Sequence, residues 1–146
     1  MELKAMTRLL YDLCAENDVR FSPFCWRVKL ALAHKRLNYQ TEPVRFTEKS
    51  KLEFSGQKLV PVLNDKGTIV SDSWAIAEYL EETYPDAPTL FPGNEGKHMA
   101  KLTTEWMDGQ NRELLTFIIL DIFAKLNVKD QAYFRYNREE RFGKPL

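Results

Sequence analysis

Residues 58–73 combine a lysine, a proline and a cluster of small polar side chains that together could hold a short anionic peptide. Proline cannot donate to a sheet ladder, so Pro61 belongs at the first position or on the edge of its strand. With a cis bond before Pro61, the backbone of Val60 would turn outward and could pair with an extended peptide. Residues 71–73 then open a helix, whose free N–H groups attract a carboxylate. The same residues also fit a plain β-hairpin.

A second group that could do chemistry begins at Ser22-Pro23. Serine is a favoured N-cap and proline is tolerated at the first helical position, so this pair predicts a helix that ends near residues 35–36. The Ser22 hydroxyl would lie at the positive end of that helix. Cys25 follows in the first turn and is interpreted as a small core residue.

The elements that must position these groups follow the order βαβ and then ββα. We expect a strand at 8–14, the helix from residue 23, a strand at 39–44, a loop with a short helix at 46–57, the hairpin and a helix from 73 to 84. This order predicts an α/β fold with one mixed, four-stranded sheet and helices on both faces.

Beyond a proline-rich crossing the pattern becomes wholly helical. We therefore expect domains at residues 1–86 and 94–146, with a linker at 87–93. A break at residues 127–130 separates two helices. The nearly continuous apolar run at 117–123 must be buried by something, which predicts an oligomer, a shortened version of a longer protein, or both.

Charge and cysteine usage exclude several function classes. The 146 residues carry 21 basic and 21 acidic side chains, so nothing favours nucleic acid or an anionic membrane as partner. The basic series at 135, 138 and 141 is interpreted as a solvated face. Two cysteines make no disulfide framework, isolated histidines predict no metal site, and the start at residues 1–4 lacks a secretory signal. We expect a soluble, cytoplasmic protein.

Three motifs in this order resemble the glutathione transferases: Ser22-Pro23-Phe24-Cys25-Trp26-Arg27, the Val60-Pro61 strand entry, and Ser71-Asp72-Ser73 leading into a helix. The resemblance covers residues 8–93 and implies a thioredoxin-like domain. Residues 71–85 are most similar to the branch of bacterial lignin β-etherases and related fungal transferases. Members of the family continue with further helices, so the resemblance implies a truncated helical C-terminal domain.

By this resemblance Ser22 is the catalytic serine, whose hydroxyl donates to the sulfur of glutathione and favours the thiolate. The alternative is that Ser22 only caps its helix. In related disulfide oxidoreductases a Cys-x-x-Cys pair places the reactive thiol first; here Ser22 occupies that place and Cys25 the fourth. Disulfide chemistry of the glutaredoxin kind is therefore a weak alternative.

The resemblance also implies a set of glutathione-binding residues: Phe24, Lys58, Val60, Pro61, Asp72 and Ser73. Val60 pairs through its backbone with the cysteinyl part. Asp72 and Ser73 bind the γ-glutamyl end, with an ordinary helix cap as the alternative. Lys58 reaches the glycyl carboxylate or is simply solvated. Trp26 and Trp106 either border the electrophile site or belong to the core.

The function implied is a detoxifying transferase in which glutathione, a co-substrate, attacks an electrophilic carbon of the aryl ether or halide type, with no metal. The alternative is a non-catalytic module that binds glutathione or another ligand and functions through oligomerisation, or a purely structural partner domain. Expected partners are a small electrophile and a second copy in a dimer.

Overall fold

The computed structural model describes residues 7–146, apart from the side chain at position 112. Residues 1–4, for which the sequence predicts no secretory signal, lie outside the described residues. The chain divides into two compact units, residues 1–90 and 91–146. Among the described residues, no helix is both long and apolar enough to cross a membrane.

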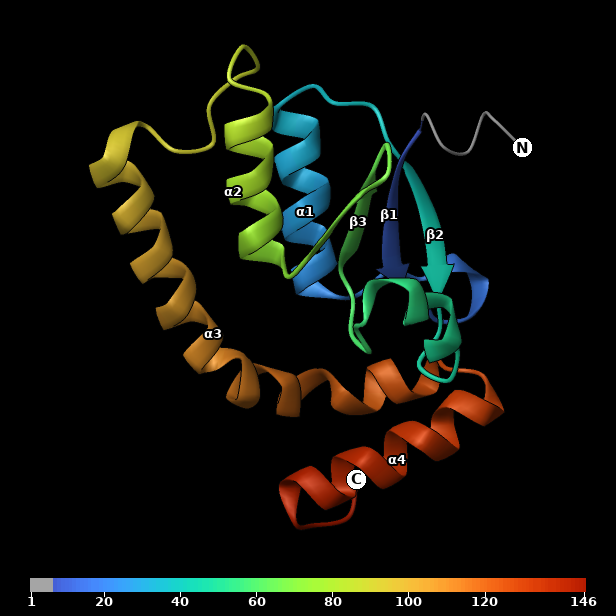
Figure 1. Cartoon of the computed structure of the whole chain (residues 1–146). Helices are drawn as coiled ribbons and strands as arrows, with labels where there is room; N and C mark the ends of the chain where they lie inside the picture. Colours follow the sequence, from blue (N-terminus) through green and yellow to red (C-terminus); the bar gives the residue numbers. More distant parts are fainter. Residues whose placement is uncertain (1–6) are drawn as a thin grey trace. The chain divides into compact units, whose positions relative to one another are not determined.

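The first unit contains a mixed, four-stranded sheet, as predicted (Figure 1). Its strands are β1 (Arg8–Leu13), β2 (Gln40–Val44), β3 (Val62–Asp65) and β4 (Thr68–Ser71), in the order β2-β1-β3-β4. β1 pairs with β2 in parallel, whereas β3 is antiparallel to both β1 and β4. The tight turn between β3 and β4 explains the antiparallel pair, because two neighbouring strands joined by a short turn cannot run in parallel.

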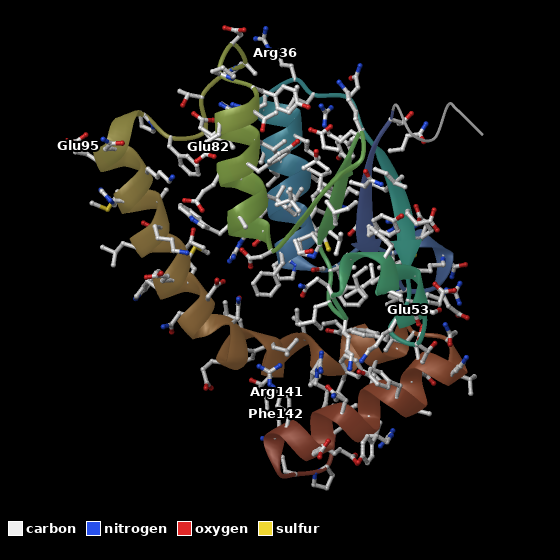
Figure 2. The ribbon with its side chains drawn as sticks, viewed as in Figure 1. Arg36, Glu53, Glu82, Glu95, Arg141 and Phe142 are labelled. Atoms are coloured by element: carbon white, nitrogen blue, oxygen red, sulfur yellow. The ribbon has the colours of Figure 1, made fainter. Side chains whose placement is uncertain are left out.

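Two helices, α1 (Pro23–His34) and α2 (Ser73–Thr83), pack on one face of the sheet. Side chains from both helices and from the central strands fill the space between them (Figure 2). The shared core consists of fully buried apolar residues: Leu10, Val28, Leu32, Leu63, Ile76 and Leu80. Burying each such side chain stabilises the fold by about 1.5–3 kcal/mol, so this layer holds both helix starts in place.

The other face of the sheet is covered by a short 3₁₀ helix, η2 (Lys49–Ser55). Its buried Leu52 packs with Val44 of β2 and Val62 of β3. Helices on both faces were expected, and the structure places both α-helices on one face and only this short helix on the other. Strand alternation is the reason, since Leu10 and Leu63 face α1 and α2 while Val62 points the opposite way.

The second unit consists of α3 (Gly93–Ala124) and α4 (Val128–Phe142). The predicted break at 127–130 is shorter in the structure, because the Asn127 side chain accepts from the Asp130 amide at 2.9 Å and caps α4. Residues 128–130 therefore form the first turn of that helix. Several apolar side chains of the 117–123 run are exposed in the described unit: Phe117, Ile118 and Leu120.

The end of α2 is tied to the segment after it through Glu81. Its Oε2 lies 2.7 Å from Lys35 Nζ and accepts from the Leu90 amide at 3.0 Å, and Thr89 also donates to the carboxylate. Burial would raise the pKa of Glu81, but the hydrogen bonds from Lys35, Thr89 and Leu90 outweigh it and lower the pKa to about 2. The Lys35 side chain is fully buried, so its charge would be left without a counter-ion if Glu81 were removed.

Replacing Glu81 by glutamine is expected to destabilise the protein strongly at pH 6 and much less at pH 3. The folded-state pKa is depressed, so the stabilisation is complete above pH 4.5 and is lost as pH falls toward 2. The loss at pH 6 should lie below the about 3–5 kcal/mol of a fully buried pair, because the Glu81 side chain is 25% exposed. Urea unfolding at both pH values measures it.

The matched control is Glu82→Gln, which changes the exposed neighbour labelled on α2 in Figure 2. It should alter the free energy of unfolding by less than about 0.5 kcal/mol at either pH. A pH-independent effect of Glu81→Gln would contradict the role given to the Lys35 pair.

Candidate functional site

Strand pairing brings the predicted site segments to one end of the sheet. The register places Tyr11 opposite Val62 and Val62 opposite Ser71. The end of β1, the start of β3 and the end of β4 therefore lie side by side. Since α1 follows β1 and α2 follows β4, both helices begin at this end of the first unit (Figure 1).

Ser22 occupies the N-cap of α1. Its Oγ accepts a hydrogen bond from the Cys25 amide at 3.3 Å, and its carbonyl accepts from the Trp26 amide at 3.0 Å. The residue is 6% exposed. The capping interaction is therefore present and uses one lone pair of the hydroxyl, while the same hydroxyl also interacts with the Cys25 thiol.

The segment that leads into β3 contains Val60 and Pro61, joined by a cis peptide bond. β3 begins only at Val62, so Val60 lies outside its paired residues. Pro61 is buried and Val60 is half-buried. Lys58 is exposed and lies two residues before Val60, in the loop between η2 and β3.

Asp72 and Ser73 form the start of α2. Asp72 is its N-cap, and Oδ1 accepts from the amides of Trp74 at 2.9 Å and Ala75 at 3.0 Å. Its backbone has φ 76° and ψ 133°, a sparsely populated region for a non-glycine residue. Ser73 is 7% exposed, whereas Asp72 is exposed. The carboxylate thus faces solvent with one oxygen engaged in capping.

The aromatic residues named from the sequence are exposed. Phe24 lies in the first turn of α1 with the Arg27 guanidinium 5.0 Å from its ring centre. Trp26 is 46% exposed, and its Nε1 donates to the Arg20 carbonyl at 2.9 Å. Trp106 belongs to the second unit and is also exposed. Both indoles are therefore accessible in the structure.

Both cysteines are free and buried. Burial raises the pKa of Cys25 to about 11, against a smaller opposing effect of the Ser22 hydroxyl. Burial also raises the pKa of Cys14. The thiolate is the reactive form, so neither side chain is a nucleophile near neutral pH.

Cys25 in the folded protein is expected to react with iodoacetamide at pH 8 at least about 100-fold more slowly than in the denatured protein. A rise in pKa from 9 to about 11 lowers its thiolate fraction by that factor before steric protection is counted. Mass spectrometry of the alkylated peptides measures the rate, and the denatured protein is the control. Equal rates in the two states would contradict the burial of this thiol.

Sequence reasoning missed a buried ionic cluster next to these segments. Asp12 of β1 is 1% exposed, and its Oδ2 lies 2.9 Å from Lys29 Nζ and 3.0 Å from Arg20 Nη1. A signal existed: in a strand with alternating burial, Asp12 is in phase with Leu10, which places its carboxylate on a buried face. A buried carboxylate requires partners, which would have pointed to nearby cations.

Comparison with known proteins gives consistent matches. Residues 21–83 match the family described as "Glutathione S-transferase, N-terminal domain". A maleylacetoacetate isomerase of Dictyostelium discoideum is 28% identical over 120 residues, which are 77% of this chain and 55% of that protein. The chain therefore spans about half the length of this curated relative.

Solved structures similar to this chain are also glutathione transferases. The chain is similar to the glutathione transferase GSTFuA2 of Phanerochaete chrysosporium, with a TM-score of 0.82 and 28% identity over 95% of this chain and 63% of that one. It is also similar to a glutathione S-transferase of Ceriporiopsis subvermispora in complex with glutathione, with a TM-score of 0.80 and 28% identity over 94% and 61% of the two chains.

Proposed function

We infer that this chain, a member of the glutathione S-transferase family by its N-terminal domain, binds glutathione at the end of the sheet where α1 and α2 begin. The observation that carries the proposal is the convergence of two helix N-termini with the start of β3 at one end of the sheet. A helix N-terminus favours negative charge, and glutathione at neutral pH offers two carboxylates and a sulfur that can ionise. Three solved neighbours contain glutathione.

The γ-glutamyl end of glutathione would bind at the start of α2. The second oxygen of the Asp72 carboxylate can accept from the α-ammonium, because capping occupies only Oδ1. The Ser73 hydroxyl and the first amides of α2 suit the α-carboxylate. Lys58 would meet the glycyl carboxylate.

The cysteinyl part would pair with the backbone of Val60, which lies outside the β3 ladder. This places the sulfur toward the start of α1, where Pro61 and Phe24 border the site. The Ser22 hydroxyl would donate its proton to the glutathione sulfur, and the α1 N-terminus would add to the stabilisation of the thiolate. A reducing compartment such as the cytoplasm supplies glutathione as the free thiol.

In the reaction proposed, the thiolate forms a carbon–sulfur bond with an electrophilic carbon while the bond to an aryl ether oxygen or a halide breaks. Positioning of the thiolate and stabilisation of its charge would supply the rate gain. Maleylacetoacetate isomerases among the relatives indicate an alternative outcome. An isomerisation returns glutathione, whereas a substitution consumes one molecule for each product, so a glutathione balance separates the two.

A glutathione-binding module without turnover is the second candidate, functioning through oligomerisation. It is favoured by the exposed apolar side chains of α3. Binding of glutathione without consumption or isomerisation of any electrophile would support it. A purely structural domain would not bind glutathione at all.

Calorimetric titration of glutathione tests the binding site directly. Asp72→Asn keeps a good N-cap and removes the charge, so we expect about tenfold to 100-fold weaker binding with unchanged stability. The matched control is Asp86→Asn, an exposed carboxylate in the segment after α2, which should leave the affinity unchanged. Equal affinities of both variants would remove Asp72 from the site.

Replacing Ser22 tests the catalytic assignment. With a generic aryl halide, Ser22→Ala and Ser22→Gly should both lower kcat by about 10²-fold while glutathione still binds, since each removes the hydroxyl that stabilises the thiolate. The two differ in capping: alanine loses about 1 kcal/mol of stability and glycine only a few tenths. Unchanged turnover in both variants would leave Ser22 as a helix cap only.

A further inference from the structure

The Asp12 carboxylate is a buried junction between a strand, a loop and a helix. It lies on β1, and its Oδ2 contacts Arg20 of the loop at 3.0 Å and Lys29 of α1 at 2.9 Å. A buried ion pair is weak evidence for stability, so a role of these contacts in holding the loop against the strand and the helix is the better explanation.

The cluster holds the loop that carries Ser22 from several sides. Arg20 lies two residues before Ser22, and its guanidinium bridges Asp12 and Asp18. The carbonyl of Arg20 accepts from Trp26 Nε1 at 2.9 Å. The Lys29 Nζ lies 3.8 Å from the centre of the Trp26 ring, a cation–π contact. Lys29 and Arg20 therefore both contact the same indole.

Ser22 is consequently fixed on both flanks. Its carbonyl and hydroxyl are held by the first turn of α1, and the residue two positions earlier is held by Asp12 and Trp26. The loop also has contacts of its own: its Asn17 and Asp18 adopt left-handed backbone conformations, and Asp18 Oδ1 accepts from the Arg20 guanidinium. The contacts with Asp12 join this loop to β1 and, through Lys29, to α1.

We propose that Asp12 is a positioning residue that acts through Arg20 and Lys29 to set the place at which the Ser22 hydroxyl meets the glutathione sulfur. The inference rests on the proposed function for its chemical consequence. It predicts that loss of the Asp12 charge affects the step that needs a positioned hydroxyl. It should not affect the contacts of the γ-glutamyl end, because Asp72 and Ser73 belong to a different loop and helix.

The first unit offers a matched control at the opposite end of the sheet. Asp65 is 3% exposed, its Oδ1 lies 3.1 Å from Arg8 Nε, and it also accepts from the hydroxyls of Tyr79 and Tyr84. The register pairs Arg8 with Asp65, three positions along β1 from the Tyr11–Val62 pair. Asp65→Asn thus removes a buried carboxylate of the same kind without touching the Ser22 loop.

The experiment compares Asp12→Asn with Asp65→Asn in the full chain, using steady-state kinetics with glutathione and an aryl halide. Asp12→Asn should lower kcat by about 10²-fold, as expected for a displacement of roughly 1 Å, and change the KM for glutathione by less than about threefold. Asp65→Asn should lower the melting temperature but keep kcat. A raised KM with unchanged kcat in Asp12→Asn, or equal kcat losses in both variants, would overturn the proposal.

Hydrogen exchange of residues 14–26 tests the positioning without glutathione. Asp12→Asn should speed exchange there at least about tenfold, and Asp65→Asn should not. If the wild-type chain binds no glutathione, the proposed function fails, and this measurement still decides whether Asp12 fixes the loop. Unchanged exchange in Asp12→Asn would overturn the positioning role.

A second variant covers the case in which Asp12→Asn does not fold. Arg20→Gln keeps the ion pair between Asp12 and Lys29 and removes only the ion pair between Asp12 and the loop residue Arg20. Like Asp12→Asn, it should lower kcat and leave the KM for glutathione nearly unchanged, and it should speed hydrogen exchange of residues 14–26. A fully active Arg20→Gln with wild-type exchange would refute the route through Arg20.

Discussion

The position of β3 between β1 and β4, antiparallel to both, is the constraint on which the candidate site depends. It places the end of one strand, the start of the next and the end of a third at the same edge, and so brings together segments that lie some fifty residues apart in the chain. The buried layer of α1 and α2 then fixes both helix starts there. Shifting the register of β3 by one residue would move its buried side chains to the opposite face and separate these groups.

Electrostatics at this end of the sheet favour an anionic ligand. Two helix N-termini supply partial positive charge, while the acidic side chains nearby are engaged: Asp72 by backbone amides and Asp12 by Arg20 and Lys29. Burial raises the pKa of both cysteine thiols, which therefore stay neutral. Neutral thiols do not repel a bound thiolate, and they do not act as nucleophiles in its place. Hydroxyl groups rather than protein thiols are thus the donors available to a glutathione sulfur.

The helical unit contributes differently from the α/β unit. Asn127 caps α4 and both helices have buried residues of their own, yet α3 presents exposed apolar side chains. In the first unit every central strand has an apolar layer on both faces. The glutathione site proposed here lies entirely within the α/β unit.

Four features could be predicted from the residues alone: the order of the elements, the Ser22 start of α1, the proline at the entry to β3 and the polar residues before α2. These features follow from local physics, namely caps, ring constraints and strand alternation, which act within a few residues. Tertiary structure alone decided that α1 and α2 share one face of the sheet and that Asp12 joins Arg20 and Lys29. Such contacts depend on which distant surfaces meet in the packed core, and a buried charge finds its partners only there.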